Sequence, residues 1–389
     1  MKRILILADG NIYERRGYFN AVINRTKHLM EISDFDIDIL ILSEYEPLLV
    51  RCLRKTKKIL KPNFVEIEGL KMRIDWKRFS LIDYILHVKL HKPEFLRKLH
   101  NKKILRSLGG YDLVISHSLN CGKLAREIKQ RYGTPYTVTW HGSDIHTEPF
   151  NNSSSFRPVV DVIESANMNF FVSNALLKTS DLLTKKGVKQ VLYNGYNLIF
   201  YRYSDEKRSE LRDKYIVKDK KVITFAGNFL EVKNILLVPE IFKTIYERFK
   251  NVEFWMIGGG KYESEVKKMS EGLPIRFWGN QPIDAMPEFL NTSDVLILPS
   301  KNEGLPLIVV EALMSGCMVV GSRVGGIPEV LGEDYCVDLK SPTFVSDFAD
   351  MVLRVLNNAG VSVKSVDSKF DWRESATKEL GYIKLILGM

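Results

Sequence analysis

Two glutamates, Glu303 and Glu311, are separated by seven residues in a stretch that also contains a glycine. A helix is predicted over Pro306–Ser315, which places the first glutamate in a glycine-containing loop at the start of the helix and the second about two turns into it. A carboxylate at each place could bind two separated hydroxyl groups of one ligand. The backbone N–H groups of Gly304 and Leu305 suit an anion such as a diphosphate, because helix N-termini favour negative charge. The alternative is a carboxylate that stabilises its own helix dipole, followed by an unrelated buried glutamate.

A histidine, His141, directly follows the apolar run Tyr136–Trp140 and precedes a glycine. Ligands of open parallel sheets bind beyond the carboxyl ends of the strands, so this side chain is expected to point toward a ligand. The alternative is a histidine with a purely structural role. His117 and His146 are weaker candidates.

Three other patterns have the wrong context for the chemistry they suggest. The D-x-D spacings in Asp34–Asp38 precede an apolar run instead of following one, so no metal site is expected there. Gly258–Gly260 is not followed by a G-x-G-x-x-G pattern, and the chain has no P-loop motif. The four cysteines have no C-x-x-C spacing, which disfavours a zinc site and a disulfide framework. A dehydrogenase and a P-loop enzyme are therefore disfavoured.

The elements that position the candidate residues form two series of apolar runs separated by segments of helical period. Of the 389 residues, 45% are hydrophobic and 27% charged, which suits two globular domains. Apolar runs of this kind are typical of parallel sheets buried on both faces. The second series begins after the charged stretch Ser204–Lys221. The predicted strands are 4–8, 37–42, 113–116, 136–140, 170–172 and 191–193 in the first series, and 222–226, 252–257, 275–278, 295–298 and 318–321 in the second.

The net charge of +10 comes from one part of the chain. Residues 51–106 hold 17 Lys and Arg against five Asp and Glu, a difference of +12, together with several aromatic residues. We interpret this segment as basic helices with a solvated face and a core face. The alternatives are binding to an anionic membrane surface and binding to nucleic acid. No run approaches 18 apolar residues, so a cytoplasmic location is expected.

The stretch Asp294–Gly326, extended by Gly325-Gly326-Ile327-Pro328-Glu329, resembles the donor site of glycosyltransferase family 4. The resemblance covers most of the chain and is strongest over residues 222–330. It implies the GT-B fold, in which two Rossmann-like α/β domains face each other across a cleft. The expected domains are 1–197, completed by a C-terminal helix over 373–389, and the nucleotide-sugar-binding domain 198–372.

The resemblance also implies a role for each residue that matches the family pattern. Glu303 would contact the transferred sugar, Glu311 the ribose hydroxyls, and His141 the donor sugar or the transition state. The family pairs an arginine with a lysine after the first strand of the second domain. In the loop that begins at Gly227, Lys233 matches the lysine but Asn228 replaces the arginine.

The loop after the first strand departs from the family as well. The family commonly has a Gly-Gly pair there, whereas this chain reads Glu14-Arg15-Arg16-Gly17-Tyr18. Gly17 is then the one glycine left to approach the donor phosphate. Arg15 and Arg16 could assist with that phosphate or could be solvated.

Together with the resemblance, these features predict a metal-independent glycosyltransferase that uses a UDP- or GDP-linked sugar as co-substrate and needs no cofactor. Retention at the anomeric carbon is what the resemblance implies. The expected acceptor is a glycan or a lipid-linked sugar of surface polysaccharide synthesis, met at the inner face of the cell membrane by the basic segment. The alternatives are a nucleotide-sugar epimerase, a sugar phosphorylase, or a basic nucleic-acid-binding protein. The last is disfavoured because the basic segment lacks the aromatic spacing of RNA-binding sheets and a zinc-finger pattern.

Overall fold

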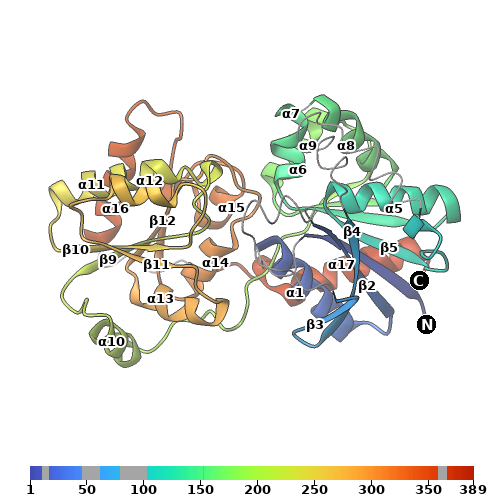
Figure 1. The fold of residues 1–389 in the computed structure, drawn as a ribbon, viewed down its shortest axis with the longest axis horizontal. Helices are drawn as coiled ribbons and strands as arrows, with labels where there is room; N and C mark the ends of the chain where they lie inside the picture. Colours follow the sequence, from blue (N-terminus) through green and yellow to red (C-terminus); the bar gives the residue numbers. More distant parts are fainter. Residues whose placement is uncertain (11–16, 46–61, 79–102, 152, 358–365) are drawn as a thin grey trace. The chain divides into compact units, whose positions relative to one another are not determined.

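The computed structural model describes residues 1–10, 17–45, 62–78, 103–151, 153–357 and 366–389. The chain forms two compact units, each a β-sheet covered by helices (Figure 1). Unit 1 comprises Met1–Val172, Leu176–Asn194 and Trp372–Met389, and unit 2 comprises Ser173–Ala175 and Gly195–Asp371. The predicted class, two parallel-sheet α/β domains, is confirmed.

Unit 1 contains an eight-stranded sheet that is parallel except for its edge strand β3. In sheet order the strands are β3 (Phe64–Ile67), β4 (Leu70–Arg78), β2 (Asp36–Tyr45), β1 (Arg3–Asp9), β5 (Leu113–His117), β6 (Tyr136–Trp140), β7 (Met168–Phe171) and β8 (Lys189–Val191). Helices cover both faces of the sheet (Figure 1). They are α1 (Gly17–Ile32), α5 (Ser118–Tyr132), α6 (Ser143–His146), α7 (Glu148–Asn151), α8 (Ser153–Ser165), α9 (Asn174–Leu183, in this unit from Leu176 onward) and α17 (Trp372–Leu387).

The prediction that residues 51–106 form basic helices is wrong for residues 64–78, which form the β3–β4 hairpin. The hairpin turns at Glu68 and Gly69, whose φ angles of 51° and 81° fit a tight two-residue turn. Alternate apolar residues around the turn are buried, namely Ile67, Leu70, Met72 and Ile74. Residues 51–61 and 79–102, with Lys55, Lys57, Lys58 and Lys61, lie outside the described residues, and so does most of the predicted membrane surface.

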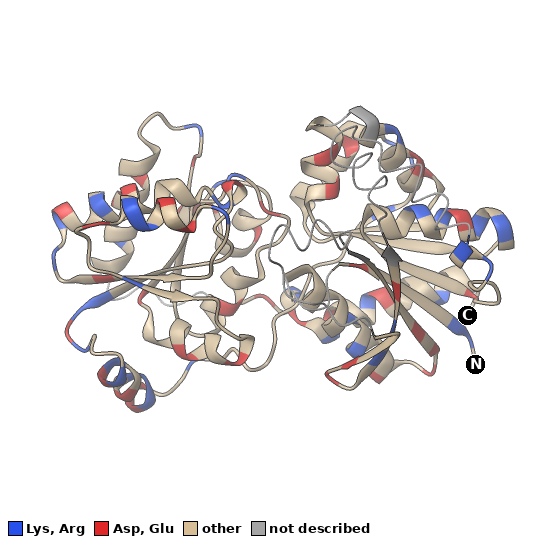
Figure 2. Ribbon diagram, viewed as in Figure 1, with Lys and Arg blue, Asp and Glu red and all other residues tan. Residues whose placement is uncertain are grey.

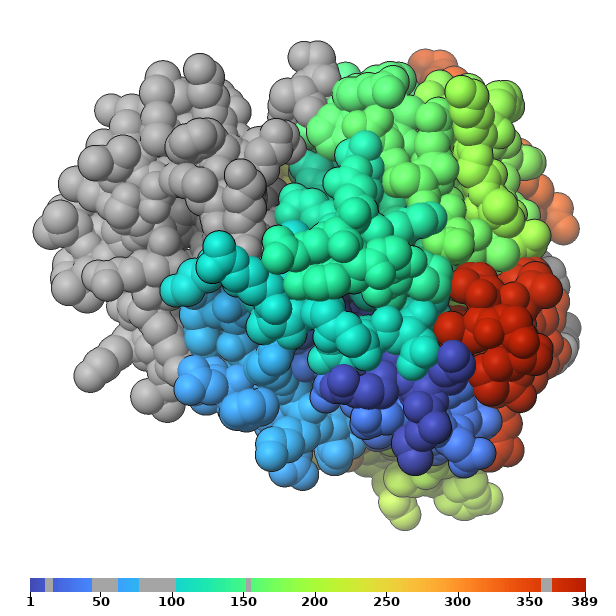
Figure 3. All heavy atoms as spheres, turned by 90° about the vertical axis from the view of Figure 1, so that its right-hand side faces the viewer, coloured from blue at the N-terminus to red at the C-terminus, as the bar shows by residue number. Residues whose placement is uncertain are grey.

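The C-terminal helix α17 packs on α1 in unit 1, beside the N-terminal segments of the chain (Figure 3). An ion pair joins the two helices: Arg25 Nη1 lies 3.5 Å from Glu379 Oε2, and both side chains are almost fully buried. Arg25 Nη2 also donates to the carbonyl oxygen of Leu192 and to Asn194 Oδ1, at 3.3 and 3.1 Å. Arg25 thus contacts two parts of unit 1. One is the segment at which the chain leaves this unit, and the other is helix α17, with which the chain returns to it.

Unit 2 contains a six-stranded parallel sheet. In sheet order the strands are β11 (Ile275–Gly279), β10 (Val252–Ile257), β9 (Lys221–Ala226), β12 (Val295–Leu298), β13 (Met318–Ser322) and β14 (Cys336–Val337). In Figure 1, α11, α12 and α16 cover one face, and α13 and α14 the other. The helices are α10 (Asp205–Lys214), α11 (Val238–Arg248), α12 (Glu263–Met269), α13 (Met286–Thr292), α14 (Leu307–Met314), α15 (Ile327–Leu331), α16 (Phe344–Asn357) and the short 3-10 helices η1 (Glu231–Lys233), η2 (Ile235–Leu237), η3 (Ile283–Ala285), η4 (Glu333–Tyr335) and η5 (Ser368–Phe370).

Most of the charged stretch before the second series of strands forms helix α10, along which basic and acidic residues are interspersed (Figure 2). Ser204 caps this helix by accepting a hydrogen bond from the backbone N–H of Lys207.

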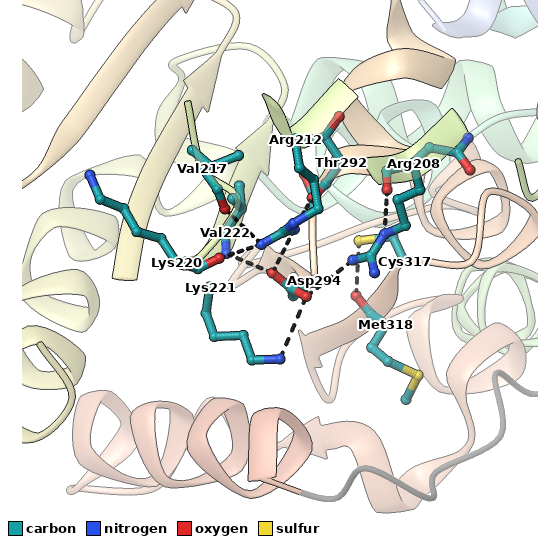
Figure 4. A network of polar contacts seen from close by, with 12 residues as sticks. Arg208, Arg212, Val217, Lys220, Lys221, Val222, Thr292, Asp294, Cys317 and Met318 are labelled. Atoms are coloured by element: carbon teal, nitrogen blue, oxygen red, sulfur yellow. Dashed lines mark hydrogen bonds and ion pairs between the residues drawn. The ribbon is translucent and has the colours of Figure 1, made fainter. Parts of the chain in front are cut away.

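A network around Asp294 attaches α10 to the sheet of unit 2 (Figure 4). Asp294 Oδ1 lies 3.1 Å from Arg208 Nη2, and Oδ2 lies 3.2 Å from Arg212 Nη1. The backbone N–H of Val222 also donates to Asp294 Oδ2 at 2.8 Å. Asp294 precedes β12 and Val222 is near the start of β9, so the network lies at the amino ends of these strands. The loops that follow β9 and β12 lie at the opposite, carboxyl ends of these strands.

None of the helices in the described part of the chain is long and apolar enough to cross a membrane.

Candidate functional site

Three loops meet beyond the carboxyl ends of β9, β12 and β13, which are neighbours in the sheet of unit 2. They are residues 227–234 after β9, 299–306 after β12, and 323–326 after β13. The backbone N–H of Lys301 donates to the carbonyl oxygen of Val232 at 2.8 Å, which joins the first loop to the second. The N–H of Gly326 donates to the carbonyl oxygen of Glu303 at 3.3 Å, which joins the second to the third. The order of the strands reverses between β9 and β12, and α/β sheets bind ligands beyond the carboxyl ends of the strands at such a point.

Glu303 and Lys233 form an ion pair at the centre of these loops. Lys233 Nζ lies 2.6 Å from Glu303 Oε1, and the side chains are 21% and 10% exposed, respectively. Ser300 Oγ donates to the same carboxylate oxygen at 2.7 Å. Among the described residues, none hydrogen-bonds to Glu303 Oε2. The carboxylate is therefore fixed through one oxygen and can accept a ligand hydroxyl with the other.

Gly325 and Gly326 let the third loop approach the second closely. A Cβ on Gly325, whose φ is 52°, would lie 1.8 Å from the carbonyl oxygen of Glu303. A Cβ on Gly326 would lie 2.2 Å from the carbonyl oxygen of Gly304. Any larger residue would push the backbone of the Glu303 loop out of place. The two glycines of the Gly-Gly-Ile-Pro-Glu pattern thus position the candidate carboxylate.

The backbone N–H groups of Gly304 and Leu305 have no hydrogen-bond acceptor within the described part of the chain. Both residues are buried and stand just before α14. Buried N–H groups are rarely left without a partner, and those at a helix N-terminus favour an anion. These two groups are suited to the anionic part of a ligand, as the sequence predicts.

Glu311 lies closer to the start of its helix than the sequence indicates. Helix α14 begins at Leu307, so Glu303 is in the loop before it and Glu311 is just over one turn into it. The helix predicted over Pro306–Ser315 agrees with α14 to within one residue at each end, with Glu303 in the loop at its start, whereas Glu311 is just over one turn into the helix and not two. Burial raises the pKa of Glu311 to about 7. Near neutral pH this carboxyl group can therefore be either ionised or protonated.

The loop after β9 contains Gly227, Asn228 and Lys233. The stem of Lys233 passes Gly227, since its Cε lies 4.0 Å from the place a Cβ would occupy there. Asn228 is exposed. The Gly258–Gly260 triplet supports this loop, because a Cβ on Gly258 would lie 2.0 Å from the carbonyl oxygen of Gly227. Sequence reasoning set the triplet aside as a failed dinucleotide motif and missed this role.

The two remaining sequence candidates, His141 and Gly17, belong to unit 1. Gly17 is the exposed first residue of α1. His141 directly follows β6, and its ring packs against Tyr18 at 4.9 Å between centroids and an interplanar angle of 90°. His117 Nδ1 lies 3.2 Å from His141 Nε2. Sequence reasoning ranked His117 low, although it ends the strand next to β6 and its partnership with His141 follows from that adjacency.

Asp144, in the short helix α6 that follows His141, ties this helix to helix α5. Its Oδ2 accepts a hydrogen bond from the backbone N–H of Leu119 at 3.1 Å, which satisfies one free donor in the first turn of α5. Burial, together with the nearby charge of Asp9, raises the pKa of Asp144 to about 7. Asp144 therefore joins the two segments that follow His117 and His141.

No group of three His, Cys, Asp or Glu side chains suited to a metal ion occurs among the described residues.

Part of the chain matches a family of known proteins. Residues 207–378 match the family Glycosyl transferases group 1. The chain is 24% identical over 245 residues to the putative teichuronic acid biosynthesis glycosyltransferase TuaC of Bacillus subtilis. The aligned residues cover 62% of this chain and 61% of TuaC. The chain is also 30% identical over 257 residues to N-acetyl-alpha-D-glucosaminyl L-malate synthase of Bacillus anthracis, and this alignment covers 62% of this chain and 63% of the synthase. The chain therefore spans less than two thirds of the length of these relatives.

Among solved structures, Anabaena HepE in complex with UDP and glucose superposes on this chain with a TM-score of 0.71 and 14% identity. The superposition covers 99% of this chain and 100% of HepE. At this identity the likeness shows the fold, and the predicted GT-B class is confirmed.

Proposed function

We propose that this chain, whose residues 207–378 form a glycosyl transferases group 1 domain, transfers a sugar from a nucleotide diphosphate sugar to an acceptor hydroxyl. The observation that carries the proposal is the Lys233–Glu303 pair, a cation and a carboxylate, next to the N–H groups of Gly304 and Leu305; one carboxylate oxygen and both N–H groups have no hydrogen-bond partner among the described residues. A diphosphate needs the cation and the N–H groups, and a sugar hydroxyl needs the carboxylate oxygen. The solved structure of HepE holds UDP and glucose, which supports a nucleotide-sugar donor.

The departing diphosphate must be stabilised as the glycosidic bond breaks, and Lys233 with the N–H groups of Gly304 and Leu305 would supply that charge compensation. The proposed reaction therefore needs no metal ion. Asn228 can offer only a neutral hydrogen bond where the family has an arginine, so donor binding rests more heavily on Lys233. With no second carboxylate assigned as a nucleophile, we propose that the leaving phosphate assists attack on the same face, with retention at the anomeric carbon.

The proposed acceptor is a glycan or a lipid-linked sugar of surface polysaccharide synthesis, which would place the enzyme at the inner face of the cell membrane. The name of TuaC, a putative teichuronic acid biosynthesis glycosyltransferase, supports this choice.

A thermal-shift series with UDP, GDP, their sugar conjugates and inorganic diphosphate tests the donor proposal. One nucleotide series is expected to raise the unfolding temperature, because a ligand at 100 times its Kd stabilises the native state by about 2.7 kcal/mol. Diphosphate alone should give a smaller shift. No shift with any nucleotide sugar at millimolar concentration would contradict the proposal.

Donor affinity is expected to increase between pH 6 and pH 8 because of Glu311. Its pKa of about 7 means that the ionised form, which accepts hydrogen bonds from both ribose hydroxyls, gains population over this range. A raised carboxyl pKa means that the proton is held to higher pH than usual, so binding that needs the carboxylate weakens as the pH falls. Calorimetric titration at several pH values should show this trend in the wild type. Glu311→Gln should bind several-fold more weakly at pH 8 and lose the trend, whereas an unchanged trend would exclude Glu311.

A further inference from the structure

The buried ion pair between α1 and α17 in unit 1 leaves most of its hydrogen-bonding atoms without a partner. Arg25 is 2% exposed and Glu379 is fully buried. Within the described part of the chain, nothing hydrogen-bonds to Nε or Nη1 of Arg25 or to either carboxylate oxygen of Glu379. Arg25 Nη1 and Glu379 Oε2, 3.5 Å apart, attract each other as charges without forming a hydrogen bond. Two opposite charges are thus buried together with unsatisfied donors and acceptors.

Strand β6 adds two buried hydroxyl groups on the face of the sheet that α17 covers. Thr137 and Thr139 are fully buried, and neither Oγ1 has a hydrogen-bond partner among the described residues. Thr139 pairs in register with Phe170 of β7, whose ring lies 5.5 Å from that of Tyr382 in α17. Thr137 is two residues before Thr139 and therefore points to the same face. Both hydroxyl groups thus lie beneath α17.

The ion pair faces the same part of the sheet as Thr139. Glu379 is three residues before Tyr382, so the two side chains are neighbours on one side of α17. Thr139 also pairs in register with His117 of β5. Burial, a neighbouring imidazole and the charge of Arg25 lower the pKa of His117 well below its usual value, which places the guanidinium group near this histidine. The unpartnered atoms of Arg25, Glu379 and Thr139 therefore lie in one layer between the sheet and the two helices.

The chemistry of these atoms selects a small neutral ligand that both donates and accepts hydrogen bonds. The N–H groups of Arg25 need an acceptor, the carboxylate of Glu379 needs a donor, and the hydroxyl of Thr139 can serve as either. An anion would be repelled by Glu379 and a cation by Arg25. Leaving these groups unsatisfied is costly, most of all for the two charged ones. Water meets every condition, and buried waters commonly make about three hydrogen bonds to such groups.

We propose that unit 1 contains a buried water site between β6, α1 and α17, in which at least one water molecule accepts a hydrogen bond from Arg25 and donates to Glu379 and Thr139. The water completes the hydrogen bonds of the ion pair and attaches the returning helix α17 to the sheet. This inference is independent of the proposed function, because the site needs no nucleotide sugar and all of its residues belong to unit 1.

A crystal structure of the full chain, at a resolution that shows ordered water, tests the site directly. A water molecule is expected within about 3.2 Å of both an Arg25 nitrogen and a Glu379 oxygen. A dry site, in which Glu379 hydrogen-bonds directly to Arg25 or to Thr139, would overturn the proposal.

Oxygen-17 magnetic relaxation dispersion, which counts long-lived internal waters, tests the site in solution. The double variant Arg25→Met with Glu379→Met removes both charges together, because removing one alone would leave the other buried and unpaired. It is expected to hold at least one long-lived water fewer than the wild type. An equal number in the two proteins would overturn the proposal. If the double variant does not fold, the crystal structure and the threonine variants still decide the matter.

Thr139→Val and Thr224→Val form a matched pair of variants. Thr224 is also fully buried in a strand, β9 of unit 2, but its Oγ1 lies 2.6 Å from Ser293 Oγ and therefore has a partner within the protein. Thr139→Val should make the internal water exchange about fivefold to tenfold faster, the effect of one lost hydrogen bond. Thr224→Val should leave the dispersion unchanged. Equal effects in the two variants, or none in Thr139→Val, would overturn the contact between the water and Thr139. Sugar transfer enters none of these measurements, so this inference and the proposed function can fail separately.

Discussion

A Glu303→Gln variant is expected to lose sugar transfer by about a hundredfold to a thousandfold, the effect of removing one preorganised electrostatic group from an active site. The amide keeps the shape of the side chain and can still accept from Ser300 Oγ, which lies 2.7 Å from the carboxylate. It loses the negative charge that would face the positive charge developing on the sugar. Initial rates at saturating donor, measured by product release, give the change in kcat.

The matched control is Glu231→Gln. Glu231 Oε1 lies 3.0 Å from Lys301 Nζ and joins the same two loops, but the pair is far more exposed than Lys233–Glu303. Exposed ion pairs contribute little to stability, so this variant should keep its unfolding temperature and its rate within about twofold. Equal losses in the two variants would mean that Glu303 acts through loop structure. Wild-type turnover in Glu303→Gln would remove Glu303 from the reaction.

Lys233→Ala is expected to weaken donor binding by about tenfold to a hundredfold and to lower kcat as well, since a hydrogen bond to a charged group contributes about 1.5–3 kcal/mol. The two effects occur together because the ammonium group contacts the diphosphate both in the bound donor and as the leaving group departs. Calorimetric titration with the nucleotide sugar gives the first effect, and single-turnover kinetics the second.

Lys301→Ala is the corresponding control, because it removes a lysine from the neighbouring pair between the same loops. The double variant Lys233→Ala with Glu303→Gln completes a cycle that measures their coupling. If Lys233 acts only by holding Glu303, the double variant should have the same kcat and donor affinity as Glu303→Gln alone. Unchanged nucleotide affinity in Lys233→Ala would contradict its contact with the diphosphate.

Much of the fold could be predicted from the pattern of apolar residues. The strands 136–140, 252–257 and 295–298 have the same bounds in the structure as in the sequence analysis. All are buried on both faces, so their apolar runs end where the strands end. The β3–β4 hairpin was missed because it alternates buried apolar residues with exposed Lys and Glu at a sheet edge. Helix α10 was missed because its composition is almost wholly charged, although Ser204 gives a helix start signal.

The site could be predicted in its residue types but not in its contacts. Glu303 and Lys233 both stand in loops after strands, yet their pairing depends on β9 and β12 being neighbours although they are distant in sequence. Lys233 and Ser300 both hydrogen-bond to Oε1 of Glu303, and the sequence does not indicate that they share one oxygen. The pKa of Glu311 depends on burial, which the spacing of the glutamates does not indicate. Only the adjacency of His117 and His141 could have been inferred, since successive strands of such sheets are usually neighbours.

The return of α17 to unit 1 determines the order in which this protein can fold on the ribosome. N-terminal domains generally fold first during synthesis. Here the buried charge of Arg25 meets its counter-charge, Glu379, only after the whole of unit 2 has been translated. Until then, the apolar surface of unit 1 that Leu380 and Ile383 cover stays open to water or to a chaperone. Unit 1 can therefore reach its final form only after unit 2 has been synthesised, although most of unit 1 is made first.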